Sequence, residues 1–381
     1  MTSRVLASQR YVLYGAPHSL YTGKVRCYLR KQRIDYLERL PSHPAYVNEI
    51  APAIGRNIIP VIVTPNGQII QDSIDIIDHF EARGVPYSAY PSAPLQCVLA
   101  VLIEYYGNQS LLRHAMHYRW SYLADQRVFL EHAFAARSDR AIAERVMARM
   151  QSYLPQLGVT PLTISAIERS YERLLEILDE HFAHHPYLLG GRPTLADYGM
   201  IGPLFAHLGR DPVPARLMKT RAPRVFRWVE RMNAPDLDAP EFVDESAELI
   251  ARDAVPPSLE PLLVHMREEV FPELIDKLAF LDLWIAKHAP RDGDPVSAKA
   301  HQRRIGVVQT MFRSLPIEAG VEPYLVYQLR RADRVLDMLD QSERARVVAA
   351  LAQRGLADAL IGERKYSVDR RNHIEVWASP T

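Results

Sequence analysis

The chain has 381 residues, too many for one ordinary domain and suitable for two or three. Lys and Arg number 46 and Asp and Glu 45, so there is no basic surplus and we expect no nucleic-acid partner. The hydrophobic fraction of 48% predicts globular cores. No segment approaches the roughly 20 apolar residues that span a bilayer, so no membrane partner is expected.

The cysteine content and the N-terminus both bear on the compartment. Cys27 and Cys97 are the two cysteines, and neither belongs to a Cys-x-x-Cys motif. They cannot build a disulfide framework. The first ten residues hold no apolar run of signal-peptide length. These features predict a cytoplasmic protein.

Residues 9–86 predict the element order β-α-β-α-β-β-α. Apolar and β-rich runs, helical spacing and the Pro65-Asn66-Gly67 turn mark the elements. They are strands at 11–14, 34–37, 58–63 and 68–71, helices at 19–33 and from 72 to near 84, and a short helix or turn at 44–50. The first half needs a crossover and therefore parallel pairing, whereas the second half is a hairpin. This order is typical of a thioredoxin-like domain.

Three motifs in this segment make the prediction more specific. Ser19 stands five residues before a Lys-Val pair, Ile59 precedes Pro60, and Gln71-Asp72-Ser73 opens the last helix. In this order and spacing they resemble the N-terminal domain of the glutathione transferase superfamily. The resemblance implies glutathione as co-substrate, a cis bond before Pro60, and an activated thiol at the start of the first helix.

The chemistry requires a group that stabilises a thiolate. A free thiol has a pKa of about 8.5, and a hydroxyl donor at a helix N-terminus would lower it. The resemblance assigns this catalytic role to Ser19, although Ser19 also fits a plain helix cap. Tyr14 and Tyr21 are the alternatives, and Tyr14 also fits a core tyrosine. Leu20 replaces the proline that usually follows the reactive residue.

The resemblance also implies the residues that hold glutathione. Asp72 and Ser73 would bind the γ-glutamyl ammonium and carboxylate at a helix N-terminus. The backbone of Ile59, held by a cis Pro60, would bind the cysteinyl group. The glycine carboxylate needs a cation, and the candidates are Arg56, which we favour, Lys24 and His43.

Proline-rich residues 86–94 separate this domain from a helical one at 94–235, with an insertion at about 121–160. A helical pattern from 98 to 120 carries a candidate wall for the substrate pocket, made of Tyr105, Tyr106, His114, His117 and Arg119. His114 and His117 share a helix face and also fit structural hydrogen bonding. Two histidines are too few for a metal site, and we expect no metal. The motif at 185–198 resembles the family's C-terminal core motif, in which Thr194 and Asp197 form a capping box.

The resemblance ends near residue 235, and residues 236–381 form an extension. Its pattern predicts helices at 261–288, 298–312, 321–339 and 341–360, then a hairpin at 365–377. The apolar content is too high for a disordered tail. We expect an all-helical second domain with a mostly helical extension packed on it as scaffolding or an interface.

Two functions remain open. The first is a glutathione transferase-like enzyme, in which a glutathione thiolate attacks a small hydrophobic electrophile, as in detoxification. The second is a non-catalytic scaffold of the same fold, which the long extension and Leu20 favour. The resemblance also implies a two-fold homodimer.

Overall fold

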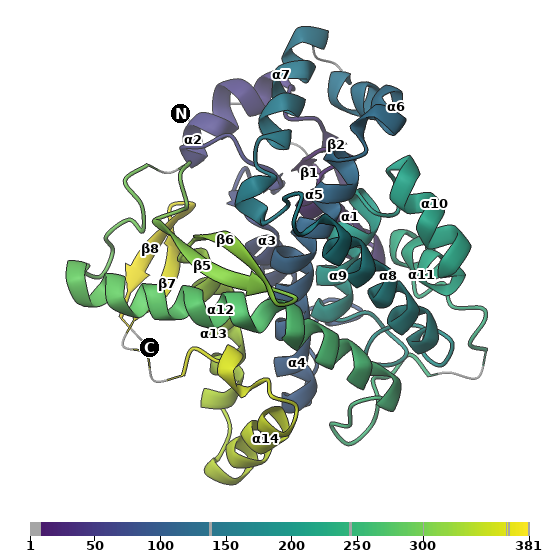
Figure 1. The fold of residues 1–381 in the computed structure, drawn as a ribbon, viewed down its shortest axis with the longest axis vertical. Helices are drawn as coiled ribbons and strands as arrows, with labels where there is room; N and C mark the ends of the chain where they lie inside the picture. The colour runs from purple at the N-terminus through teal and green to yellow at the C-terminus, as the bar shows by residue number, and fades with distance from the viewer. Residues whose placement is uncertain are drawn as a thin grey trace.

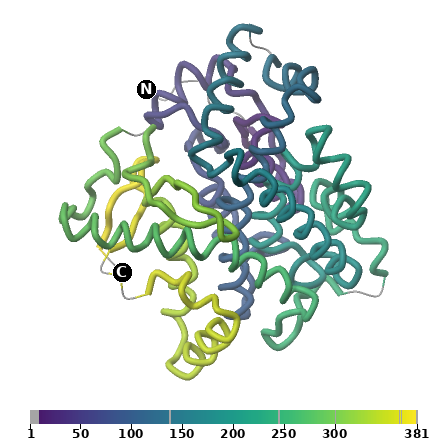
Figure 2. The backbone as a smooth tube through the Cα atoms, in the orientation of Figure 1, coloured from purple at the N-terminus to yellow at the C-terminus, as the bar shows by residue number. Residues whose placement is uncertain are grey.

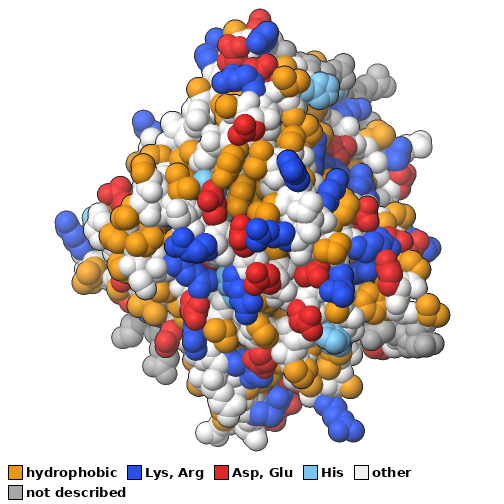
Figure 3. All heavy atoms as spheres, turned by 45° about the vertical axis from the view of Figure 1, so that its right-hand side comes forward, with side chains coloured by type: hydrophobic (Ala, Val, Ile, Leu, Met, Phe, Trp, Pro, Cys, Tyr) orange, Lys and Arg blue, Asp and Glu red, His pale blue; other side chains and the backbone are white. Residues whose placement is uncertain are grey.

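The computed structural model describes residues 9–136, 139–243, 246–299, 301–362, 364 and 366–379. Figure 1 places the N-terminal domain at the top, the following helices at the centre and right, and the extension across the left and bottom. Figure 3 shows one face, where positive and negative side chains are interspersed without a large patch of one sign. None of the described helices is long and apolar enough to cross a membrane.

The N-terminal domain has the predicted thioredoxin-like order. Its strands are β1 (Tyr11–Tyr14), β2 (Tyr36–Arg39), β3 (Val61–Val63) and β4 (Ile69–Gln71), and its helices are α1 (Leu20–Lys31), η1 (Tyr46–Ile50), α2 (Ala51–Ile54) and α3 (Ser73–Glu81). The sheet order is β2-β1-β3-β4. β1 pairs with β2 in parallel and with β3 antiparallel, and β3 pairs antiparallel with β4. The crossover and the hairpin are therefore confirmed.

The two faces of this sheet belong to different cores, because successive side chains of a strand alternate. Leu13 and Ile62 point into the large core that both domains share. Val12 and Tyr14 point into a smaller core under η1 and α2, and Tyr14 packs against the ring of Tyr46 with centroids 5.7 Å apart. The strand pattern thus turns Tyr14 toward a packed interior.

Helices of the second domain follow one another along the chain. They are α4 (Pro94–Tyr105), η2 (Tyr106–Ser110), α5 (Leu111–Trp120), α6 (Leu123–Ala135), α7 (Arg140–Gln151), η3 (Pro155–Leu157), α8 (Ile164–His181), α9 (Leu195–Ala206), α10 (Pro212–Arg221) and α11 (Pro223–Asn233). Glycines allow α9 to cross very close to η2 and α4. A Cβ on Gly107 would lie 2.4 Å from the backbone of Gly199. A side chain at either position would push the helices apart.

The predicted capping box is present at the start of α9. Thr194 and Asp197 exchange the two reciprocal bonds. The Asp197 carboxylate also accepts hydrogen bonds from the Leu188 N–H at 3.0 Å and the Trp228 indole N–H at 3.2 Å. Burial raises the pKa of Asp197 to about 6, even though these donors oppose the rise. One buried carboxyl therefore joins three segments of the domain.

Asp197→Asn should change how stability depends on pH. Asp197 in the folded protein takes up a proton near pH 6, whereas in the unfolded chain it does so near about 3.9. The protonated side chain of Asp197 therefore contributes fully to the free energy of unfolding at low pH, and this contribution is lost as the pH rises through the pKa of the folded protein. Between about pH 7 and pH 4, the wild type should gain up to about 3 kcal/mol relative to the variant. Urea unfolding across this range tests this, and a pH-independent difference would contradict it.

The extension is a mixture of helices and hairpins. It comprises η4 (Pro257–Leu259), α12 (Glu260–His288), β5 (Gly306–Phe312), β6 (Leu315–Val321), α13 (Tyr324–Asp337), α14 (Gln341–Gln353), η5 (Ala357–Ala359), β7 (Ser367–Arg371) and β8 (Ile374–Ala378). The predicted helix at 261–288 is confirmed, and so is the last hairpin, apart from Lys365, which lies outside the described residues.

The helix predicted at 298–312 is wrong. Residues 306–312 form a strand that pairs antiparallel with residues 315–321. Their side chains alternate, with Thr310 and Phe312 buried and Met311 exposed. The two turn residues, Arg313 and Ser314, have φ values of 47° and 65°. Such turns are usually signalled by Asn-Gly or Asp-Gly, and this turn lacks that signal.

The extension packs on both domains, whereas the sequence predicted packing on the second one alone. The large core includes Leu13 of β1, Val98 of α4 and Leu263, Leu329 and Trp377 of the extension. In Figure 2 the green and yellow chain of the extension lies along one side of the purple and blue chain. The extension is therefore part of the same interior.

Candidate functional site

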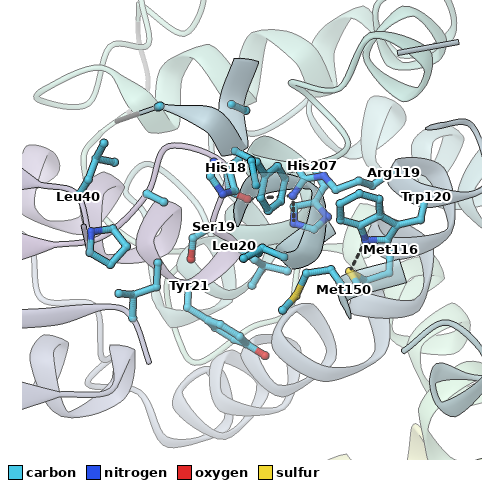
Figure 4. Close-up of a pocket in the computed structure, with 18 of the residues that line it drawn as sticks. His18, Ser19, Leu20, Tyr21, Leu40, Met116, Arg119, Trp120, Met150 and His207 are labelled. Carbon is cyan, nitrogen blue, oxygen red and sulfur yellow. Dashed lines mark hydrogen bonds between the residues drawn. The ribbon is translucent and has the colours of Figure 1, made fainter. Parts of the chain in front are cut away.

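A cavity of about 440 Å³ lies between the N-terminal domain and α5, α6 and α7. Most of its lining is apolar. From the first domain it is lined by Ser19, Leu20, Tyr21, Leu40 and Ile59, and from the second by Leu112, Met116, Trp120, Phe134, Ala143, Val146 and Met150. Figure 4 shows Ser19 and Tyr21 between Leu40 on one side and Met116, Trp120 and Met150 on the other. The shape suits a small hydrophobic molecule.

Ser19 lies on the cavity wall at the start of α1. It is the N-cap residue, and its hydroxyl oxygen accepts a hydrogen bond from the Thr22 N–H at 3.3 Å. Ile59 lines the same cavity, and the Ile59–Pro60 peptide bond is cis, as the motif predicted. Two of the three sequence motifs therefore meet at one cavity, beside the N-terminal end of a helix.

The two tyrosine alternatives lie differently. Tyr21 lines the cavity, but its hydroxyl donates to the carbonyl oxygen of Asn108 at 3.0 Å. Burial raises its pKa well above the ordinary value, so the group stays protonated at neutral pH. Tyr14 is 1% exposed in the smaller core and does not line the cavity. Of the three candidates, Ser19 and Tyr21 line the cavity and Tyr14 does not.

Three polar side chains also line the cavity: Arg119, which the sequence placed in the candidate pocket wall, and His18 and His207, which it did not single out. Arg119 donates to Asp211 at 2.6 and 2.9 Å, to the His18 carbonyl oxygen at 3.0 Å, and contacts His207 Nε2 at 2.8 Å. Burial, reinforced by Arg119, lowers the pKa of His18 to about 3. Burial also lowers the pKa of His207, so both histidines line the cavity as uncharged side chains at neutral pH. The available sequence signal was the position of His18 directly before Ser19, and nothing in the sequence pointed to His207.

The substrate wall predicted from Tyr105, His114 and His117 lies elsewhere. The cavity contacts positions 112, 116, 119 and 120 of α5, which share one helix face. His114 and His117 lie on the other face: His117 contacts Ser121 at 2.9 Å and Glu168 at 3.0 Å, and His114 lies 3.7 Å from Glu269. Tyr105 is buried in the large core. Structural hydrogen bonding therefore fits His117, while His114 and Tyr105 are buried residues that do not line the cavity.

The predicted γ-glutamyl site is occupied by the extension. Asp72 caps α3, accepting from the Ile74 N–H at 3.0 Å, and it also accepts from the Tyr324 hydroxyl at 2.8 Å. Arg303 and Arg370 lie 3.6 and 3.7 Å from its second oxygen. Asp72 is 6% exposed and Ser73, the first residue of α3, is 5% exposed. Neither lines the interdomain cavity.

The cations proposed for the glycine carboxylate also have partners within the chain. Arg56 donates to Glu375 at 3.0 and 3.2 Å and to the carbonyl oxygen of His373. Lys24 pairs with Glu104 at 2.5 Å, with both side chains fully buried. His43 packs against the Tyr14 ring, with centroids 6.0 Å apart. The predicted role of Arg56 therefore competes with a carboxylate of the last hairpin.

Asp72 and Arg56 belong to one network, which we call the arginine–carboxylate cluster. Its members are Asp72, Asp75, Glu375, Arg56, Arg303 and Arg370. Glu375 contacts Arg303 at 2.7 Å and Arg370 at 2.5 Å, and Arg370 reaches Asp75 at 2.8 Å. Three carboxylates face three guanidinium groups, so the ion-paired set is neutral.

The pKa values of the three carboxyls reflect this arrangement. Burial opposes ionisation of Asp72 and Glu375, but the arginines outweigh it and hold both pKa values below the ordinary range. Burial and the neighbouring Asp72 raise the pKa of Asp75 to about 6. Among the described residues, no group of three or more side chains is arranged to hold a metal ion.

Comparisons with known proteins agree with this architecture. Residues 13–86 match the family model for the glutathione S-transferase N-terminal domain, and residues 140–231 match the one for the C-terminal domain. No curated protein matches the chain.

Several solved structures are similar to part of this chain. A glutathione S-transferase from Rhodospirillum rubrum F11 is 16% identical, covering 65% of this chain and 96% of its own, with a TM-score of 0.39. Beta-etherase LigF from Sphingobium sp. strain SYK-6 is 14% identical, covering 61% and 99%, with a TM-score of 0.44. FzlA from C. crescentus is 17% identical, covering 64% and 97%, with a TM-score of 0.35.

The matched segments include the sheet with its cis Ile59–Pro60 bond and the helices around the Thr194–Asp197 capping box. The described chain continues past the second match with α12, two hairpins and two more helices. This chain belongs to the glutathione S-transferase superfamily, and it extends beyond that family's C-terminal domain.

Proposed function

We propose that this protein binds a small, largely apolar molecule in the interdomain cavity and presents its polar or reactive end to Ser19. The observation that carries the proposal is the cavity itself, about 440 Å³ with a mostly apolar lining and Ser19 on its wall. Burying apolar surface supplies about 25 cal/mol per Å², while the cap position of α1 favours a partial negative charge.

Filling the cavity should abolish binding. Ala143 lies on α7, is 3% exposed and lines the cavity, so Ala143→Phe places a ring in the ligand's space. Anilinonaphthalene sulfonate serves as the probe, and its binding beside Trp120 is followed by quenching of tryptophan fluorescence. The affinity for the probe should fall by at least about tenfold. The matched control is Val128→Phe on α6, where the side chain is 83% exposed and does not line the cavity. Equal affinities in both variants would reject the proposal.

A second candidate function is activation of a thiol for attack on a small electrophile. It is favoured by Ser19 and Ile59 lining one cavity, since the family resemblance assigns these positions to the glutathione sulfur and cysteinyl group. In this reaction the thiolate sulfur bonds to the electrophilic carbon and the leaving group departs with the bonding electrons. A charge-assisted hydrogen bond from Ser19 would contribute about 1.5–3 kcal/mol to thiolate formation.

Two substitutions at Ser19 separate thiolate stabilisation from helix capping. Aspartate caps a helix as well as serine does, but its carboxylate cannot donate a hydrogen bond. With chlorodinitrobenzene and benzyl mercaptan, an apolar thiol without a γ-glutamyl arm, Ser19→Ala and Ser19→Asp should both lose conjugation, and the pKa of the bound thiol should rise by about one to two. If Ser19→Asp keeps the wild-type rate and thiolate absorbance, Ser19 only caps α1.

A further inference from the structure

We propose that the C-terminal extension permanently fills the γ-glutamyl position of this chain, so that the cavity takes ligands without a γ-glutamyl arm. The inference rests on the proposed function, because it concerns the ligand of the same cavity. Arg370 and Tyr324 hold Asp72, where the γ-glutamyl ammonium would bind, and Glu375 holds Arg56, the cation proposed for the glycine carboxylate.

The extension pairs with Asp72 and with Arg56, the carboxylate and the guanidinium group that glutathione would otherwise pair with. The guanidinium groups of Arg303 and Arg370 face Asp72, and the carboxylate of Glu375 lies 3.0 Å from Arg56. Because the ion-paired cluster is neutral, an incoming ammonium and carboxylate would have to displace partners rather than neutralise unpaired charge. A γ-glutamyl group therefore gains little at this position while the extension is in place.

The extension is anchored too firmly to act as a lid. Val368 and Trp377 of the last hairpin belong to the large core, where Trp377 is 2% exposed and stacks on Trp284 with centroids 5.2 Å apart. Arg331 of α13 pairs with the fully buried Glu104 of α4. Opening the γ-glutamyl position would separate buried ion pairs and expose aromatic surface together, so we infer a fixed replacement.

The cavity remains open to a ligand even with this position filled. Asp72, Ser73 and Arg56 do not line the cavity, whereas Ser19 and Ile59 do. The specificity-determining residues are therefore Tyr324, Arg370 and Glu375. They exclude the amino-acid end of glutathione and leave the apolar part of the site accessible.

The test removes two of the side chains that occupy the γ-glutamyl position and asks whether glutathione then binds there. The double variant Arg370→Ala/Glu375→Ala removes one positive and one negative charge, so the cluster stays neutral. Asp72 then keeps Tyr324 and Arg303 but loses Arg370, and Arg56 loses the carboxylate of Glu375. Glutathione at about 10 mM should raise the melting temperature of this variant saturably by about 2–4 °C. The wild type should show no shift with either ligand, and cysteinylglycine, which keeps the glycine carboxylate but lacks the γ-glutamyl group, should shift the double variant by less than glutathione does.

Each outcome decides the inference. A saturable glutathione shift in the wild type overturns it, and so does a folded double variant that glutathione does not stabilise. If the double variant does not fold, calorimetric titration of the wild type with glutathione decides: saturable heat overturns the inference and its absence supports it. Trp120 quenching by anilinonaphthalene sulfonate tests the cavity separately, so a failure of the proposed function is distinguishable.

Discussion

Replacing Glu104 with alanine is expected to destabilise the protein by about 3–5 kcal/mol, because it leaves two buried cations unpaired. Glu104 pairs with Lys24 of α1 at 2.5 Å and with Arg331 of α13, and the Lys24 and Glu104 side chains are 0% exposed. Burial alone would raise the pKa of Glu104, but Arg331 and Lys24 outweigh it and hold this pKa below its ordinary value. The carboxylate therefore stays charged throughout the neutral range.

Urea unfolding at neutral pH measures the effect. Glu144→Ala is the matched control, because Glu144 pairs with Arg140 on the surface of α7, where the two side chains are 54% and 75% exposed. It should change stability very little. The pKa of Glu104 is lower in the folded protein than in the unfolded chain. The ionised side chain therefore contributes to the free energy of unfolding above the unfolded pKa of about 4.3, and this contribution is lost as the pH falls through the folded pKa. A loss that is the same at low and neutral pH would contradict this account.

Arg370→Ala is the second substitution with a large expected effect, a loss of about 3–5 kcal/mol. The Arg370 side chain is 4% exposed and donates to Asp75 at 2.8 Å, Glu375 at 2.5 Å and the Gln71 carbonyl oxygen at 3.0 Å. Without it, three largely buried carboxylates face two guanidinium groups. The substitution therefore strands negative charge between the N-terminal sheet and the last hairpin.

The neighbouring residue provides the control on the same strand. Arg371 is 46% exposed and pairs with Asp292 at 3.0 Å, so Arg371→Ala should leave the unfolding midpoint almost unchanged. Thermal and urea unfolding of the two variants compare a buried and an exposed arginine with one sequence step between them. Equal losses would show that the hairpin itself matters and that the cluster does not.

The sequence predicts the first domain well because its signals are local. Turn residues, alternating strands and the spacing of Ser19, Ile59 and Asp72 are read from neighbouring positions, and the sheet order and cis bond agree with them. The capping box is equally local, since Thr194 and Asp197 are three residues apart. The domain boundaries near 86 and 235 and the homodimer stay predictions, and light scattering during size-exclusion chromatography would test the dimer.

The partners of the predicted binding residues could not be found in the same way. Asp72 meets Tyr324 and Arg370, and Arg56 meets Glu375, across separations of 252, 298 and 319 residues. No periodicity or motif connects positions so distant, and the extension falls outside the family resemblance. The choice between the two faces of α5 was also undetermined, because both faces carry polar and apolar residues.

The long-range pairing has a consequence for biosynthesis. Lys24 and Glu104 leave the ribosome early, whereas Arg331 follows 227 residues after Glu104. The hairpin that completes the cluster around Asp72 is made later still. Until the extension is made, Asp72, Arg56 and Glu104 therefore lack the partners that it supplies. A chain cut at residue 235, where the family resemblance ends, would remain in that unfinished state.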